Sequence, residues 1–227
     1  MCSVSNIPER RKTPPLRGSL VKWEYTNTVS KITLSMCLAD AGIVRVTYFP
    51  GAVPEDEPSY AVSPGYSAPG AEIREYDEDG VHVVETSLLR IRIRTEEQKV
   101  DFYDVATDEP LLTDEGGFGR ESKDWTGDAR VWIRKNLQET EHFFGLGDKP
   151  CALNLRGKYF SMWGADHYDF HEESDPLYKS IPFFLSLRER KAYGLLFDNT
   201  CRSYFDFGAT DEKVLSFGSF GCLLYTS

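Results

Sequence analysis

Hydrophobic and polar positions alternate over short distances along this chain. The clearest case lies at residues 88–94, where Leu89, Ile91 and Ile93 alternate with three arginines. A period of two places one set of side chains on the buried face of a strand and the other set on the opposite face. The pattern predicts a half-buried strand whose arginines cover a solvated sheet face, in preference to a basic binding stripe.

Similar short apolar runs recur from Val21 onward. Two of them flank the turn signal Ala-Asp-Ala-Gly at 39–42, and later runs occupy 131–137, 141–148, 158–163, 180–188, 191–199 and 203–208. No segment longer than about ten residues shows the 3.6-residue apolar period of a helix. Many short strands separated by turns predict an all-β protein, an antiparallel β-sandwich.

Two segments interrupt this pattern. Residues 1–18 are basic, contain proline and lack periodicity, so we expect a flexible N-terminal arm. Residues 50–72 carry prolines at 50, 54, 58, 64 and 69, which predicts a long surface loop. A chain of 227 residues can bury a sizeable core. We expect one sandwich domain over residues 19–221.

Composition narrows the possible partners. The net charge of −10 argues against nucleic acid and against an anionic membrane surface as partners. The chain has no apolar run near the ~20 residues of a membrane span, and its first residues lack a signal-peptide core. Five scattered cysteines without a Cys-x-x-Cys pair fit reduced thiols better than a zinc site or a disulfide framework. We expect a cytoplasmic protein without metal or cofactor.

Candidate chemistry concentrates in the loop at residues 164–178, which is rich in carboxylates, histidines and tyrosines. His167 and His171 have the spacing of metal ligands on a helix, but their neighbours indicate a loop, so surface histidines are favoured. The GLGDK stretch at 145–149 lacks the spacing of a phosphate-binding loop, and its glycines predict a tight turn. Carboxylates such as Asp166 and Asp175 could suggest a glycosidase, but spacing alone assigns none of them a catalytic role.

The motifs of this region, taken in order, resemble one known family. The stretches FGLGDK, RG, W-x-x-D, DPLYKSIPFF, GLLFDN and FDFG are similar to the N-terminal β-sandwich of glycoside hydrolase family 31, the α-glucosidase and α-xylosidase family. The resemblance covers roughly 200 residues and is closest to bacterial-type α-glucosidases. It implies a galactose-mutarotase-like super-sandwich that packs beside a (β/α)₈ barrel.

In that family the barrel carries the catalytic aspartates, and hydrolysis retains the anomeric configuration. The resemblance implies that this chain is truncated before the C-terminal barrel and is inactive alone. It also implies that Asp166, the aspartate of Trp163-Gly164-Ala165-Asp166, contacts sugar hydroxyls in the intact enzyme. The partner would be an α-linked glucose oligosaccharide or another α-glycoside. Gly164 and Ala165 depart from the more usual Trp-Asn-Thr-Asp. The glycoside, its linkage and the oligomeric state stay open.

The last six residues, CLLYTS, depart from the family. They are the translation of a transposase-end DNA used in sequencing libraries, so we expect residues 222–227 to be a non-native tail that completes no sheet; a natural strand is the alternative. Two other functions also stay open: a stand-alone carbohydrate-binding module, and an aldose mutarotase-like protein that would need a converging His and Glu, for which His82 and His142 are the candidates.

Overall fold

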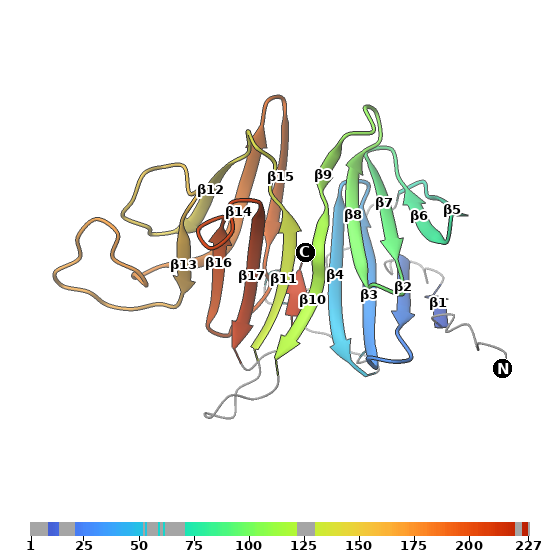
Figure 1. Ribbon diagram of the computed structural model, residues 1–227, viewed down its shortest axis with the longest axis horizontal. Coiled ribbons are helices and arrows are strands. Elements are labelled where there is room, and N and C mark those ends of the chain that lie inside the picture. Colours follow the sequence, from blue (N-terminus) through green and yellow to red (C-terminus); the bar gives the residue numbers. More distant parts are fainter. Residues whose placement is uncertain are drawn as a thin grey trace. The chain divides into compact units, whose positions relative to one another are not determined.

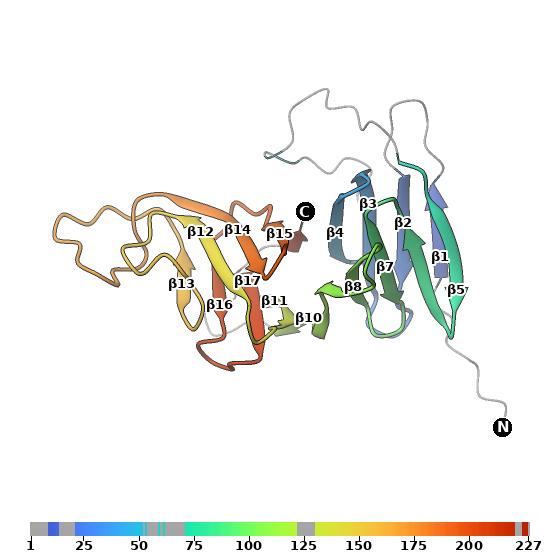
Figure 2. The ribbon, with the colours of Figure 1, turned by 90° about the horizontal axis from the view of Figure 1, so that it is seen from above.

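The computed structural model describes residues 9–13, 21–51, 53, 59, 61, 71–121, 130–220 and 224–226. These residues form strands, turns and loops without a helix, and the strand pairings are antiparallel (Figure 1). The chain divides into two compact units, residues 1–110 and 111–226. Within each unit two sheets lie face to face (Figure 2). The predicted all-β antiparallel sandwich is confirmed.

The strands of the first unit belong to two sheets, of order β1-β2-β3-β4-β18 and β5-β6-β7-β8-β9. Its strands are β1 (Glu9–Thr13), β2 (Val21–Thr26), β3 (Ile32–Asp40), β4 (Ile43–Pro50), β5 (Arg74–Glu78), β6 (Val81–Glu85), β7 (Leu89–Arg94), β8 (Lys99–Asp104) and β9 (Pro110–Leu112), with β18 (Leu224–Thr226) following β4 in the sheet order. The predicted turn lies between β3 and β4.

The second unit contains a sheet of order β10-β11-β17-β16-β13 and a smaller one of order β12-β14-β15. Its strands are β10 (Asp114–Glu121), β11 (Arg130–Asn136), β12 (His142–Gly147), β13 (Tyr159–Met162), β14 (Ser180–Arg188), β15 (Lys191–Leu196), β16 (Ser203–Phe207) and β17 (Val214–Phe220). Six fully buried phenylalanines form the centre of its core: Phe143, Phe184, Phe197, Phe205, Phe207 and Phe217. All six predicted runs from 131 to 208 are strands, because their alternate positions fill this core.

The arginine-rich strand β7 has the predicted alternation, with Ile91 and Ile93 fully buried. Its arginines are half-buried and ion-paired rather than freely solvated. Arg90 Nε lies 2.6 Å from Glu85 Oε1, and Arg94 Nη1 lies 2.5 Å from Asp101 Oδ2. This sheet face is therefore a structural charge network, which agrees with the preference against a basic binding stripe.

Residues 1–18 were expected to form a flexible arm, but Glu9–Thr13 form the strand β1, which pairs with β2. This strand has no apolar pattern to reveal it. Backbone pairing is supported by ion pairs instead, from Arg10 to Asp77 and from Lys12 to Glu75. The rest of residues 1–18, and most of the proline-rich segment at 50–72, lie outside the described residues.

Two further expectations are wrong in part. Leu224–Thr226 form the short strand β18, which follows β4 in the sheet order, whereas the tail was expected to complete no sheet. Cys37 and Cys151 are free thiols, but Cys201 is disulfide-bonded, so reduced cysteines are not the rule throughout.

In the described part of the chain, no helix has the length and apolar character to span a membrane.

Candidate functional site

The loop that connects β13 to β14 carries most of the candidate residues. It leaves the second unit's larger sheet at Met162 and enters the smaller sheet at Ser180. Figure 1 shows it projecting from the ends of these strands. A polar loop that joins two sheets of a rigid sandwich is a common place for binding residues.

An ion pair fixes the base of this loop. The ammonium group of Lys149 contacts Asp175 Oδ1, and the Lys149 side chain is only 2% exposed. The same two side chains hold one residue of β13: Lys149 donates to the carbonyl of Ser161 at 2.9 Å, while Asp175 Oδ2 accepts the Ser161 N–H. Lys149 also lies 5.4 Å from the centre of the Phe160 ring.

This arrangement has a clear structural role. Strand β13 is the last strand of its sheet, so backbone groups on its outer side have no neighbouring strand. Unpaired edge groups are costly when buried and invite aggregation when exposed. At Ser161 the Lys149–Asp175 pair satisfies both groups, as a neighbouring strand would. We call Lys149, Asp175 and Ser161 the edge clip.

The GLGDK stretch positions Lys149. It is not the simple tight turn that the glycines predict, but a β-bulge at the end of β12, with a register shift between Gly145 and Gly147. Gly147 has φ +83°, and a Cβ there would lie 2.5 Å from the carbonyl oxygen of Lys179. Only glycine allows the two strands to approach so closely. The bulge redirects the chain so that Lys149 points into the loop base.

The Arg-Gly motif also has a structural role. Arg156 Nη1 donates to the carbonyl oxygens of Gln138 at 2.7 Å and Glu141 at 3.0 Å. The Glu141 carboxylate is itself buried and accepts hydrogen bonds from Ser186 at 2.5 Å and Tyr193 at 2.8 Å. Burial first, and then the charge of Glu141, raises the pKa of the Tyr193 phenol well above its usual range. This network fixes the entry to β12.

The far part of the loop is held mainly by its own residues. The Tyr178 hydroxyl donates to the carbonyl oxygen of His167, and the Phe170 and Tyr178 rings meet edge to face with centres 6.2 Å apart. The His171 N–H donates to Ser174 Oγ at 3.0 Å. Tyr168 is 93% exposed. Compared with the base, this part makes few contacts with the sandwich.

Asp166 lies in this exposed part. Its side chain makes no hydrogen bond or ion pair with any residue that the structure describes. His167 is exposed as well, and His171 Nδ1 lies 2.8 Å from the carbonyl oxygen of Glu172. The described residues include no cluster of three or more acidic, histidine or cysteine side chains suited to a metal ion. Asp166 is thus a carboxylate available to a ligand.

The two histidines considered for mutarotase chemistry have other surroundings. His82 is buried on β6, and its Nδ1 lies 2.6 Å from the Tyr25 hydroxyl. Burial lowers the pKa of His82. His142 on β12 is exposed, and its Nδ1 lies 2.9 Å from Asn154 Nδ2. His82 Nε2 also lies 3.9 Å from Glu75 Oε2, but Glu75 already binds Lys12 and the Trp23 indole N–H. These contacts favour local structural roles for both histidines.

A hydrophobic stripe follows β14 beside the loop. Its members alternate along the strand and are 40–51% exposed: Ile181, Phe183, Leu185 and Leu187. Side chains at alternate positions share one face of a strand. Large apolar side chains exposed together on one face are typical of an interaction surface. The sequence pattern alone could not distinguish this exposed stripe from a buried one, because the apolar residues of both alternate along a strand with a period of two.

Sequence reasoning named Asp166 as a sugar contact, which stays a prediction, and missed the edge clip. Lys149 and Asp175 are 26 residues apart, and no local spacing connects them. The sequence signal that could have linked Lys149 and Asp175 is that each lies in one of the family-like motifs, FGLGDK and DPLYK. These motifs therefore carry structural residues, and the loop between them carries the candidate ligand contact.

Comparison with known proteins gives the family. The profile described as glycosyl hydrolase 31 N-terminal galactose mutarotase-like domain matches residues 33–206. Alpha-glucosidase 2 of Bacillus thermoamyloliquefaciens is 41% identical over 100 residues, or 43% of this chain, and an alpha-glucosidase of Saccharolobus solfataricus is 34% identical over 87 residues, or 38% of this chain. Each match covers 13% of the relative's own length.

Solved structures agree in fold. The GH31 dextranase of Flavobacterium johnsoniae, complexed with glucose, aligns over 97% of this chain and 25% of its own, with a TM-score of 0.78 and 25% identity. A GH31 alpha-xylosidase of Xanthomonas citri aligns over 83% of this chain and 19% of its own, with a TM-score of 0.63 and 20% identity. The chain therefore spans a quarter or less of the length of each of these four proteins. It belongs to the family of glycosyl hydrolase 31 N-terminal galactose mutarotase-like domains.

Proposed function

We propose that this domain serves a retaining α-glucosidase by holding a substrate-contacting loop against the mouth of a catalytic barrel elsewhere in the same protein. The observation that carries the proposal is the design of the 164–178 loop, fixed at its base by the edge clip and presenting a free carboxylate at Asp166. The α-glucosidase relatives, and the dextranase structure with bound glucose, support an α-linked glucose substrate.

Asp166 would act as a binding residue. A carboxylate can accept hydrogen bonds from two hydroxyl groups of one sugar, and bonds to a charged acceptor are strong. An exposed carboxylate is well solvated until the substrate and the barrel exclude water around it. The bonds would then strengthen in the transition state only if they respond to the changing shape of the sugar ring. In this role Asp166 supports catalysis without exchanging a proton or forming a covalent bond.

The hydrophobic stripe on β14 gives the domain a surface on which the barrel can pack. Four large apolar side chains, each about half exposed, would leave water on docking. They lie on the strand that receives the end of the loop, so docking there would also bring the loop to the barrel. The dextranase chain is about four times as long as the part that this domain matches, which supports a larger assembly.

The proposal is tested with the isolated chain and with the full-length product of the gene. We expect the isolated chain to show no turnover of an aryl α-glucoside and the full-length protein to hydrolyse it. In the full-length protein, Asp166→Asn should lower kcat/KM by about tenfold or more, as for loss of a hydrogen bond to a charged group. Asp169→Asn, an exposed carboxylate of the same loop, is the matched control.

Two results would contradict this function. Turnover by the isolated chain at about 1 per second or more would place the active site within the sandwich. Equal kcat/KM values for Asp166→Asn and the Asp169→Asn control would show that Asp166 makes no productive contact with the substrate.

A further inference from the structure

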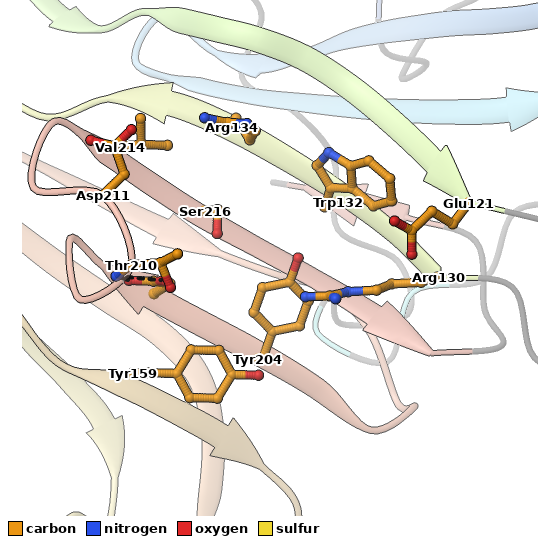
Figure 3. A pocket seen from close by; sticks show the side chains of 11 residues that line it. Glu121, Arg130, Trp132, Arg134, Tyr159, Tyr204, Thr210, Asp211, Val214 and Ser216 are labelled. Carbon is orange, nitrogen blue, oxygen red and sulfur yellow. Dashed lines mark hydrogen bonds between the residues drawn. The ribbon is translucent and has the colours of Figure 1, made fainter. Parts of the chain in front are cut away.

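A pocket of about 270 Å³ lies on the second unit's larger sheet, on the face that points away from the phenylalanine core. Figure 3 shows its lining side chains, which come from β10, β11, β13, β16, β17 and the turn between β16 and β17. Neighbouring residues such as Phe205, Phe207 and Phe217 point to the opposite face and are fully buried. The pocket does not include any residue of the 164–178 loop.

Trp132 forms a flat wall of the pocket. A Cβ added to Gly119 of the neighbouring strand β10 would overlap the five-membered and six-membered rings of the indole. The ring therefore lies directly on the backbone of Gly119 and is held parallel to the sheet. One ring face is covered by glycine, and the other is available to a ligand. Only a residue without a side chain permits this arrangement.

Two tyrosines form a second flat wall. The rings of Tyr159 and Tyr204 are stacked at 14°, with centres 5.7 Å apart. Tyr204 is buried, and burial raises the pKa of its phenol, so it stays a neutral hydroxyl at physiological pH. Tyr159 is 46% exposed. The buried ring thus supports an exposed one, which is the form of an aromatic platform.

Arg130 leaves a hydrogen-bond donor unused at this wall. Its guanidinium lies 4.8 Å from the centre of the Tyr204 ring and 5.7 Å from that of Phe220. Its Nε is buried, and no described residue accepts a hydrogen bond from it. A buried donor without an acceptor is costly, and such groups are rare in folded proteins. An oxygen atom of a ligand would satisfy it.

The charges that line the pocket favour a neutral ligand. Three carboxylates, Glu121, Asp206 and Asp211, face two guanidiniums, Arg130 and Arg134. Arg134 is already paired with Glu115 at 3.0 Å. Asp206 is buried and accepts the Ala209 N–H at 2.7 Å, which fixes its carboxylate at the pocket floor. An anion would meet more negative than positive charge, whereas hydroxyl groups could donate to the carboxylates and accept from Arg130.

We propose that this pocket is a carbohydrate-binding site that takes one neutral pyranose ring, separate from the loop that carries Asp166. A sugar ring has apolar C–H faces that suit the flat surfaces of Trp132 and Tyr159, and a rim of hydroxyls that suits the carboxylates and Arg130. The volume is just below the ~300–1,000 Å³ of pockets for larger ligands, which limits the site to one ring. Such a site would hold an α-glucan chain on the domain without cleaving it.

The test is a titration of the 227-residue chain with methyl α-glucoside, followed by NMR of the indole N–H of Trp132. We expect a saturable shift with a Kd in the millimolar range. Tyr159→Ser and Arg130→Met should each weaken binding by about fivefold or more. Asp166→Asn should leave the Kd unchanged, which separates this site from the proposed catalytic role. Near-UV circular dichroism confirms that each variant is folded.

Two further ligands sharpen the result. Inorganic phosphate and the open-chain polyol sorbitol should give no saturable shift, because the first is an anion and the second has no ring face. The proposal is overturned if methyl α-glucoside gives no saturable shift up to about 100 mM, a concentration well above a millimolar Kd. It is also overturned if phosphate saturates the site, or if binding is lost in Asp166→Asn but kept in Tyr159→Ser. That last outcome would leave the proposed role of Asp166 intact.

Discussion

Asp166 and Asp175 belong to the same loop but have opposite surroundings. Asp175 joins Lys149 and the backbone of Ser161 in the edge clip, and its side chain is 18% exposed. Asp166 is exposed and has no partner among the described residues. The comparison shows that carboxylate-rich loops cannot be interpreted from composition. One carboxylate is used for structure, while the other has no contact with the described residues, as the proposed role of Asp166 requires.

The largest expected effect comes from breaking the edge clip. Lys149→Met should lower the free energy of unfolding by about 3 kcal/mol, because it leaves Asp175 without its cation and the Ser161 carbonyl without a donor. Chemical denaturation of the isolated chain measures this change. Lys179→Met, at an exposed position near the end of the same loop, is the control and should change stability little. A loss of less than 1 kcal/mol for Lys149→Met would mean that the clip does not secure the loop.

The next effect should come from the bulge that directs Lys149. Gly147→Ala combines a positive φ with a collision against the Lys179 carbonyl, and should cost about 2 kcal/mol. Gly157 has a similar φ of +76° but open space around it, so Gly157→Ala isolates the conformational strain. If the two variants lose equal stability, close approach of β12 to the loop end is not what requires glycine at 147.

A smaller effect should follow from loosening the outer part of the loop. Tyr178→Phe removes the hydroxyl that donates to the His167 carbonyl, and should cost about 1 kcal/mol or less. Amide exchange should become faster near His167 and remain unchanged at Ser161. The matched change Tyr168→Phe removes a hydroxyl from a side chain in solvent and should have no effect. Faster exchange at both ends of the loop would contradict the separation of base and outer part.

The smallest effect should be that of Asp166→Asn on stability. An exposed side chain without a partner contributes little, so the unfolding free energy should stay within about 0.5 kcal/mol. Thermal denaturation of the isolated chain measures it. A loss above 1 kcal/mol would make Asp166 structural, and the difference between the two aspartates would disappear.

The sequence predicted the strands well, because their alternating apolar residues and intervening turns carry local signals. It missed β1, whose polar residues are held by ion pairs to Glu75 and Asp77. It also placed Asp166 in a loop but could not show the Lys149–Asp175 pair, because these two residues come together only when the two sheets of the second unit pack against each other. The pocket at Trp132 was missed for the same reason, since its walls come from five strands and a turn, whose residues have no shared spacing in the sequence.

Site-resolved amide exchange of the isolated chain tests most directly whether one loop contains a fixed base and a free outer part. The Ser161 N–H is the decisive probe, because it lies on the open edge of β13 and donates to Asp175. We predict that it is protected nearly as well as amides within the sheet, while the amides of Asp166 to Asp169 exchange at close to unfolded rates. Equal exchange rates at Ser161 and at Asp166 would contradict the account.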